Sequence, residues 1–322
     1  MKRFFCAALA VLFLFAVCTA CGAGKTSPGY PVTVGDVSFS SSPRRVVCMS
    51  RALTEGVSVL GFGGRIVGVD DSSDRPAAAV RGLPQCGSVL LPDTETILSL
   101  SPDLVLTQVP IPSAAAEALA KQEIPVLMIP YSDTFDGILS NLSALAAVFA
   151  GADGGAGLSE QIEFYADGTL EYLAGGVTEG ETAVFLMRLP AAAATGDTWL
   201  GEVLTRLGLE NGAAAGSGWV FAPEDGVYEA DVLFCDESIS AEALSQSMWK
   251  DTAAVQNGRV VYLDGSLLEA QSPAIFSVLE NAVLKAYPDG EFGERPSVSM
   301  EIEVPEPNEP GLWEKIRGFF GG

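Results

Sequence analysis

The sequence predicts an α/β protein with two parallel sheets and a helix between them. Short β-rich runs alternate with helical segments over residues 44–131 and again over residues 182–286. A longer helical stretch, residues 158–174, separates the two series. Strands that alternate with helices form parallel sheets whose faces the helices cover. Two such sheets that face one another leave a cleft, and open parallel sheets bind ligands beside the carboxyl ends of their strands.

Residues 1–20 predict a secretion signal, because a basic start precedes an apolar run that ends in small residues. Residues 18–21 resemble a bacterial lipobox, although its first position is usually aliphatic and is a cysteine here. We therefore expect lipidation of Cys21 and a tether over residues 21–36. Two or three acyl chains would then hold the chain on the outer side of the cell membrane. The alternative is a cleaved signal and release into solution.

The first α/β series predicts a lobe over residues 37–150. Leu53, Val57 and Leu60 recur at helical spacing, and Gly61 follows as a helix stop. Strands are expected at residues 44–50, 65–70, 103–108 and 124–131, and helices at residues 52–61, 114–122 and 135–151, with a further short helix after residue 93.

A linker helix is expected over residues 151–174, because Leu158, Ile162, Tyr165 and Tyr172 form one apolar stripe in it.

The second α/β series predicts a lobe over residues 175–288. Its last helix starts with Ser272 as the cap and Pro273 in the first turn, where a missing N–H group costs nothing. Strands are expected at residues 182–188, 230–235 and 258–264, and helices at residues 198–208 and 272–286.

Charge and residue usage exclude several classes of function. The chain has 18 Lys and Arg residues against 41 Asp and Glu residues, a net charge of −23, so it repels nucleic acid. It has no histidine, which removes Ser-His-Asp catalysts and the commonest transition-metal ligand. Cys48 and Cys235 are expected in the core, and the pairing of Cys86 is left open.

Short motifs in one order along the chain carry a resemblance to a known family. The runs over residues 43–76, 80–108 and 257–289 resemble substrate-binding lipoproteins of iron-siderophore, haem and cobalamin uptake transporters. The resemblance spans roughly residues 40–288. The motifs are Thr54-Glu55, Leu60-Gly61, Val67-Gly68-Val69, Gly87, Glu95 and Pro102-Asp103-Leu104-Val105.

The resemblance implies two Rossmann-like lobes, bridged by a single long helix, with the ligand cleft between the lobes. It implies that the chain performs no chemistry, has no intrinsic cofactor and delivers its ligand to an ABC permease dimer with an ATPase. In the family, one acidic residue on each lobe meets arginines of the permease. Glu95 matches the first position, and Glu224 is chosen for the second, with Asp225 as its rival. Rim charges of this kind mainly set encounter rate and orientation.

The candidate ligand is a chelated metal, because the chain lacks the imidazoles that would hold a bare ion. An anionic ferric siderophore or haem favours converging arginines, here Arg51 and Arg188. A bulky, mostly neutral corrinoid favours aromatic walls such as Trp219. We favour an iron complex and keep haem and cobalamin as alternatives. The candidate ligand-binding residues are Arg51, Ser72, Arg75, Gln108, Arg188, Trp199, Trp219 and Asp236, and core packing explains Trp199 more readily than ligand contact.

Residues 289–322 lie outside the resemblance and form an acidic, Pro-rich tail. Its last part, residues 311–322, is amphipathic and either folds back on its own lobe or lies on the membrane or the permease. A ligand sensor with the same clamp and a surface enzyme on the same lobes are further alternatives. No nucleophile–base pair is visible for the enzyme.

Overall fold

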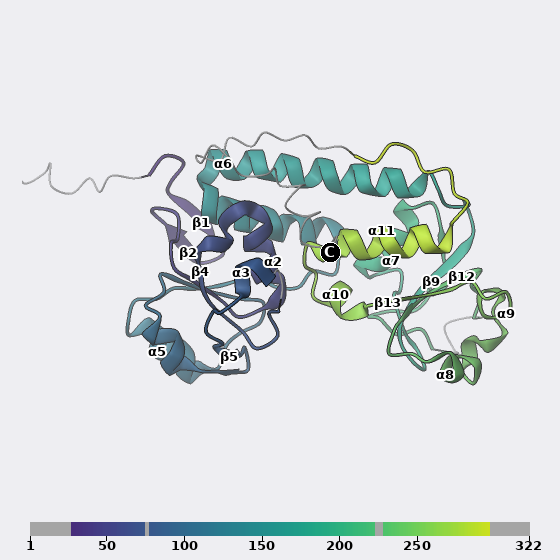
Figure 1. Ribbon diagram of the computed structural model, residues 1–322, viewed down its shortest axis with the longest axis horizontal. Helices are drawn as coiled ribbons and strands as arrows, with labels where there is room; N and C mark the ends of the chain where they lie inside the picture. Colours follow the sequence, from purple (N-terminus) through teal and green to yellow (C-terminus); the bar gives the residue numbers. More distant parts are fainter. Residues whose placement is uncertain (1–26, 75–76, 223–227, 297–322) are drawn as a thin grey trace, which may run out of the picture.

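The structure is a computed structural model that describes residues 27–74, 77–222 and 228–296. Two α/β lobes lie side by side, and the long element α6 (Phe135–Ala174) runs along both of them (Figure 1). This confirms the predicted two-lobed α/β fold. The predicted signal, Cys21 and the tail beyond residue 296 lie outside the described residues.

The N-terminal lobe contains a four-stranded sheet in the order β4–β3–β7–β8, and every neighbouring pair is parallel. Successive residues of a strand face opposite sides of a sheet. Val46 and Cys48 therefore join the main core, whereas Val47 joins a smaller core on the other face. The strands are β3 (Val46–Cys48), β4 (Ile66–Val69), β7 (Leu104–Thr107) and β8 (Val126–Met128).

Short helices cover this sheet. The first of them, α2, follows β3 directly and continues through the π turn η1 up to Gly61, whose φ is 91°. Glycine adopts such a φ without strain, so Gly61 ends the regular helix as the sequence predicts. The remaining elements of the lobe include a small antiparallel hairpin, β5–β6. The elements are α2 (Arg51–Val57), η1 (Ser58–Phe62), η2 (Gly63–Arg65), α3 (Ala77–Val80), β5 (Gly87–Ser88), β6 (Leu91–Pro92), α4 (Thr94–Ser99) and α5 (Ser113–Ala120).

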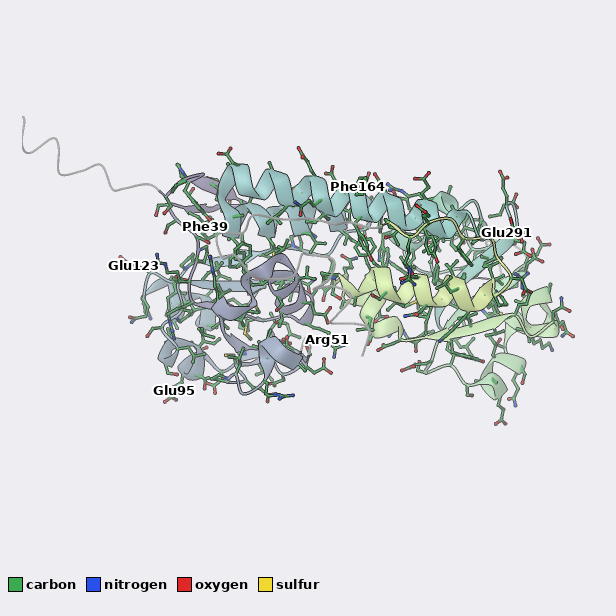
Figure 2. All side chains as sticks on the ribbon, turned by 45° about the horizontal axis from the view of Figure 1, so that its top comes forward. Phe39, Arg51, Glu95, Glu123, Phe164 and Glu291 are labelled. Atoms are coloured by element: carbon green, nitrogen blue, oxygen red, sulfur yellow. The ribbon has the colours of Figure 1, made fainter. Side chains whose placement is uncertain are left out.

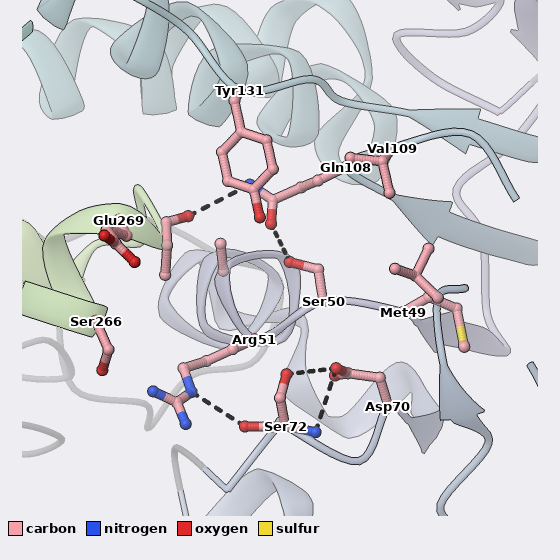
Figure 3. Close-up of a pocket in the computed structure, with 13 residues that line it drawn as sticks. Met49, Ser50, Arg51, Asp70, Ser72, Gln108, Val109, Tyr131, Ser266 and Glu269 are labelled. Atoms are coloured by element: carbon pink, nitrogen blue, oxygen red, sulfur yellow. Dashed lines mark hydrogen bonds between the residues drawn. The ribbon is translucent and has the colours of Figure 1, made fainter. Parts of the chain in front are cut away.

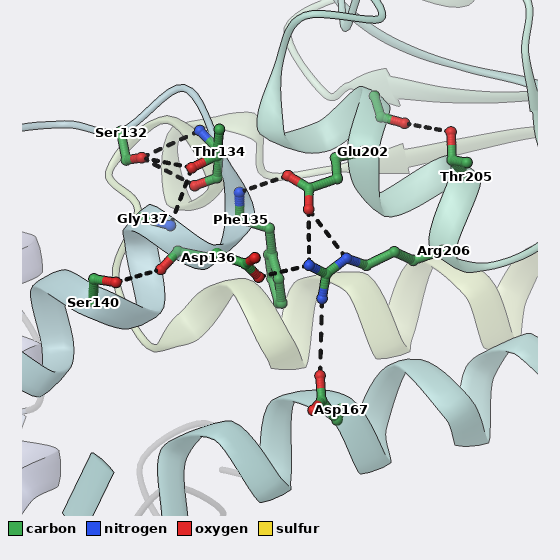
Figure 4. Close-up of polar contacts among 11 residues, drawn as sticks. Ser132, Thr134, Phe135, Asp136, Gly137, Ser140, Asp167, Glu202, Thr205 and Arg206 are labelled. Carbon is green, nitrogen blue, oxygen red and sulfur yellow. Dashed lines mark hydrogen bonds and ion pairs between the residues drawn. The ribbon is translucent and has the colours of Figure 1, made fainter. Parts of the chain in front are cut away.

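The element α6 consists of two helices joined by a reversal at Gly151, which has φ 78° and ψ −179°. At 1.5 Å per residue, a straight helix would separate Asp136 from Asp167 by about 46 Å. Arg206 instead contacts both carboxylates, at 2.6 Å and 3.8 Å (Figure 4). The predicted helix end at Gly151 is confirmed, and helix resumes at once through the glycine-rich residues 152–157.

The start of α6 is held against the second lobe by helix α7 (Trp199–Arg206). The backbone N–H of Phe135 donates to the Glu202 carboxylate at 2.9 Å, and Arg206 lies over the Phe135 ring at 5.2 Å. By length and composition alone α6 could cross a membrane, but half of its apolar window is buried inside the protein. We therefore assign α6 to the core shared by the two lobes.

The C-terminal lobe has a second sheet in the order β10–β9–β12–β13, with β11 also paired to β9. All of its pairs are parallel except β10 with β9. Phe185 and Phe234 stack between the two central strands at a centroid distance of 4.7 Å. The strands are β9 (Thr182–Arg188), β10 (Ala192–Ala193), β11 (Glu210–Asn211), β12 (Val232–Asp236) and β13 (Val260–Leu263). With α7, the helices are α8 (Ala241–Ser245), η3 (Met248–Asp251), α9 (Ala253–Gln256), α10 (Gly265–Glu269) and α11 (Ala274–Ala286).

The predicted tether is wrong for residues 30–36. Strands β1 (Val32–Val34) and β2 (Val37–Phe39) form an antiparallel hairpin that packs on α6. Val32 and Phe39 are buried, and the hydroxyl of Tyr30 donates to the backbone oxygen of Val148 at 2.8 Å. The hairpin belongs to the fold because its apolar side chains gain more from burial in this core than from an extended path in water.

Candidate functional site

A cavity of about 390 Å³ lies between the lobes, at the carboxyl ends of β3, β4 and β7 (Figure 3). Parallel strands end at the same edge of a sheet, so residues that follow separate strands meet there. The C-terminal lobe contributes α10 and the residue after it. The lining residues are Met49, Ser50, Arg51, Ala52, Asp70, Ser72, Val89, Gln108, Val109, Tyr131, Ser266, Glu269 and Ala270.

Hydrogen bonds connect the lobes beside this cavity. The Ser50 hydroxyl donates to the side-chain oxygen of Gln108, whose Nε2 donates to the backbone oxygen of Ala270 at 3.3 Å. The side chain of Gln271 donates to the backbone oxygen of Ser132 at 2.6 Å and accepts from its N–H at 2.8 Å. Ser132 follows the first sheet and Gln271 follows α10, so these bonds cross from one lobe to the other.

The arginine in the lining is already engaged by its own lobe. The Nε of Arg51 donates to the backbone oxygen of Ser72 at 3.0 Å, and one Nη lies 3.4 Å from the Asp74 carboxylate. Asp70 accepts hydrogen bonds from the hydroxyls of Ser72 and Ser73. The charged lining residues are therefore one arginine and two carboxylates, Asp70 and Glu269.

Tyr131 supplies the aromatic wall of the cavity, and its side chain is half exposed. Burial raises the pKa of its phenol, and the negative charges of Asp70 and Glu269 raise that pKa further. The hydroxyl consequently stays protonated at neutral pH and offers a hydrogen-bond donor to a ligand oxygen.

Arg51, Ser72 and Gln108, three of the predicted ligand-binding residues, line the cavity. Arg188 does not line it but pairs with the lining residue Glu269 at 3.5 Å, and its side chain is 72% exposed. This ion pair places Arg188 beside the cavity, on the C-terminal lobe.

Three other predicted residues lie away from the lining. Trp199 is 1% exposed at the start of α7, so the structure assigns it to the core. Trp219 packs partly buried against the main core, and its backbone N–H donates to the Thr195 hydroxyl at 3.2 Å. Asp236 accepts from the N–H groups of Gly265 and Ser238, both at 2.9 Å, and so holds the first residue of α10.

The remaining predicted residues are the ligand-binding candidate Arg75 and the docking candidates Glu95, Glu224 and Asp225. Glu95 is exposed in the first turn of α4, at the tip of the N-terminal lobe (Figure 2). Arg75, Glu224 and Asp225 lie outside the described residues.

Sequence reasoning missed most of the lining, for two reasons. Ser50 and Asp70 follow the ends of β3 and β4 by one or two residues. Position after a strand therefore predicts them as well, but the prediction named only their neighbours Arg51 and Ser72. The α10 residues have no local signal, because only the packing of the lobes brings them to the site. The missed residues are Met49, Ser50, Ala52, Asp70, Val89, Val109, Tyr131, Ser266, Glu269 and Ala270.

The described cysteines are free and buried, so Cys86 forms no disulfide in this structure. Burial raises the pKa of Cys86 to about 11 and that of Cys235 to about 12. Both thiols are therefore protonated and inert at neutral pH. Within the described ranges no group of three or more Cys, Asp or Glu residues could hold a metal ion.

The fold agrees with comparisons to known proteins. The chain is 25% identical over 274 residues to an uncharacterized ABC transporter substrate-binding lipoprotein, YvrC, of Bacillus subtilis (strain 168), covering 81% of this chain and 87% of that one.

Many solved structures share the fold, among them the following two. One is a possible iron-binding (periplasmic solute-binding) protein from Staphylococcus epidermidis ATCC 12228, with a TM-score of 0.65 and 19% identity over 77% of this chain and 100% of that one. The other is the periplasmic heme-binding protein RhuT from Roseiflexus sp. RS-1, with a TM-score of 0.62 and 24% identity over 77% and 98%.

The periplasmic binding protein family matches residues 46–267, from β3 of the N-terminal sheet into α10 beside the cavity. The match covers both parallel sheets and the connecting helix, and the chain therefore belongs to the periplasmic binding protein family.

Proposed function

We propose that this chain captures a ferric siderophore between its lobes and delivers it to an ABC permease. The proposal rests on the cavity that the two lobes share. A ligand bound there contacts both lobes and can favour one arrangement of the lobes over another. The names of the relatives support it, since one is described as an ABC transporter substrate-binding lipoprotein and another as possibly iron-binding.

The lining favours an iron complex of low net charge that is recognised by hydrogen bonds. Arg51 is paired with Asp74 and Arg188 with Glu269, so neither guanidinium is held ready for a strongly anionic ligand. Tyr131 instead offers a hydroxyl donor, and the Ser50 hydroxyl and the Gln108 amide keep further acceptor and donor capacity beside the bonds that they already form. A ferric trihydroxamate fits this chemistry, because three hydroxamates balance the iron charge and leave an oxygen-rich surface. The raised pKa of Tyr131 disfavours direct coordination of iron by its phenolate.

Haem is the second candidate, because an apolar rim stands beside the cavity. Val89 lines the cavity, and the next residues of the β5–β6 hairpin, Leu90 and Leu91, are 69% and 82% exposed. Such side chains suit the flat face of a macrocycle. A corrinoid has less support, since Trp219 does not line the cavity.

The proposal also includes a lipid anchor at Cys21 and docking on the permease through Glu95. The anchor would hold the chain at the outer face of the membrane. The exposed position of Glu95 at the tip of the first lobe suits a contact with a permease arginine (Figure 2).

A thermal-unfolding experiment tests the ligand. The purified chain is heated separately with a ferric trihydroxamate, with haemin and with cyanocobalamin. A ligand that binds only the native state, present at a concentration of 100 times its Kd, stabilises that state by ~2.7 kcal/mol. We expect the trihydroxamate to raise Tm. A shift with haemin alone, accompanied by a changed haem absorption band, would favour the second candidate, and no shift with any of the three compounds would contradict the proposal.

A further inference from the structure

The cavity between the lobes has one carboxylate from each lobe in its lining. Asp70 directly follows β4 of the N-terminal sheet, and Glu269 is the last residue of α10 in the C-terminal lobe. Figure 3 shows the two side chains on opposite sides of the lining. Among the lining residues that the structure describes, Arg51 is the one cation. The charge of the cavity therefore depends on whether this cation balances the two acids.

Asp70 presents a negative charge that is fixed in place. The residue is 6% exposed, and its carboxylate accepts hydrogen bonds from the hydroxyls of Ser72 and Ser73 and from the Ser72 N–H at 3.3 Å. None of the ion pairs within residues 27–74, 77–222 and 228–296 includes Asp70. A buried carboxylate without a cation is electrostatically costly, so a positively charged ligand group gains by approaching it.

The nearby arginines leave this charge unbalanced. One Nη of Arg51 lies 3.4 Å from the Asp74 carboxylate, which balances its charge. Arg188 pairs with Glu269 at 3.5 Å, and both side chains of this pair are more than half exposed. Such a surface pair contributes little, and Glu269 can exchange it for a cation of the ligand. Carboxylates thus outnumber guanidinium groups among the described residues at and beside the cavity.

Tyr131 shows where the two negative charges act together. Burial raises the pKa of its phenol, and the charges of Asp70 and Glu269 both raise that pKa further. The two carboxylates therefore act on the same part of the wall, although they come from different lobes. The phenol oxygen can also accept a hydrogen bond, so this part of the wall suits a positively charged donor.

We propose that the ligand is a ferric trihydroxamate that carries a primary ammonium group, and that the ammonium binds beside Tyr131 between Asp70 and Glu269. This inference rests on the proposed function and names the chelate more closely. An ammonium has three donors and no acceptor, which matches two carboxylates and a phenol oxygen. The hydroxamates balance the iron charge, so the whole complex is a cation. The same carboxylates repel a strongly anionic chelate such as a ferric catecholate.

A comparison of two ligands on the full-length chain tests the ammonium. Both are linear ferric trihydroxamates with the same backbone; one has a free primary amine, and the other has that amine acetylated. Isothermal titration calorimetry gives the two Kd values, and their ratio is the ammonium preference. We expect the free amine to bind about tenfold more tightly. The preference should shrink as salt is added, because salt screens the carboxylates.

Two substitutions assign the preference to the cavity. Glu269→Gln and Asp70→Asn each remove one of the carboxylates, and each should reduce the ammonium preference several-fold. The preference compares two ligands on one variant, so a smaller folded fraction weakens both affinities alike and leaves the ratio unchanged. The matched controls are Glu237→Gln and Asp133→Asn, which remove exposed carboxylates outside the lining. We expect both controls to keep the preference of the natural chain.

The outcomes separate this inference from the proposed function. Equal affinities of the natural chain for the two ligands would overturn the ammonium site and leave the capture of a trihydroxamate intact. A preference that is unchanged in Glu269→Gln and Asp70→Asn, or that falls equally in the controls, would also overturn the site. Failure of both ligands to bind would contradict the proposed function itself.

Discussion

Gln271 is the residue whose side chain most directly joins the lobes. Its amide group forms two hydrogen bonds with the backbone of Ser132, at 2.6 Å and 2.8 Å, and Gln108 adds a third crossing contact at 3.3 Å. An amide can donate and accept at once, which is what a backbone N–H and C=O pair requires.

Loss of this amide should lower stability. Gln271→Ala removes two half-buried hydrogen bonds, each of which contributes about 0.5–1.5 kcal/mol. We expect the free energy of unfolding in urea to fall by about 1–3 kcal/mol. Gln122→Ala, at an exposed position just after α5, is the control and should change this free energy little. Equal unfolding curves for both variants would show that the amide does not stabilise the lobe contact.

Asp197 makes the loop that carries Trp219 sensitive to acid. Its carboxylate accepts from the hydroxyls of Thr195 and Ser217 at 2.5 Å and 2.7 Å, and from the Gly218 N–H at 3.1 Å. These bonds, led by that of Thr195, lower its pKa to about 2. A carboxyl group with a lowered pKa stabilises the fold above its ordinary pKa near 4, and this contribution is lost as pH falls towards 2.

The pH dependence of Asp197→Asn follows from that shift. At neutral pH the variant should be less stable than the natural chain, and the difference should shrink as the pH falls from about 4 to about 2. Urea unfolding at a series of pH values measures it. The exposed Asp289→Asn serves as the control. A difference that stays constant with pH would contradict the assignment.

At the scale of elements, the reversal inside α6 decides how the lobes are joined. Gly151 combines φ 78° with ψ −179°, a region that is essentially restricted to glycine. A Cβ there would also stand about 3 Å from three backbone atoms of Gly29. The reversal therefore depends on the absence of a side chain at this position.

A pair of glycine substitutions tests this dependence. Gly151→Ala should destabilise the fold by about 1–3 kcal/mol through backbone strain and this close approach. Gly157→Ala lies in the helix with open space around it, and should stabilise the fold by up to about 1 kcal/mol because alanine has the higher helix propensity. Thermal unfolding measures both changes. Destabilisation by both substitutions would contradict the distinction between the two sites.

At the scale of the whole molecule, the candidate ligand cavity and the candidate docking residue lie apart. The cavity lies between the two lobes, whereas Glu95 lies exposed at a tip of the first lobe, on α4. If Glu95 docks on the permease, ligand affinity and transport should be separable.

Glu95→Ala should reduce transport without changing ligand affinity. We expect uptake by the reconstituted transporter to fall several-fold, because the lost charge slows and misorients docking. Glu117→Ala removes an exposed acid from α5 of the same lobe and should leave uptake unchanged. Equal uptake in both variants would remove Glu95 from the docking surface.

The amino-acid sequence alone predicted the two α/β series, the helix between them and the stops at Gly61 and Gly151. These features depend on local periodicity and on backbone angles that glycine favours. It also placed Arg51, Ser72 and Gln108 at the site, because residues after parallel strands share one edge of a sheet. The same rule also predicts Ser50 and Asp70, which follow the ends of two of these strands.

The packing of the two lobes determines which residues complete the cleft and which lie elsewhere. Glu269 and Ala270 reach the cavity through the packing of one lobe on the other, which no local pattern encodes. Tertiary packing also buries Trp199 in the core and brings Asp236 against the first residue of α10, so neither lines the cavity. The β1–β2 hairpin was also decided at this level, since its short strands are stable only against the apolar surface of α6.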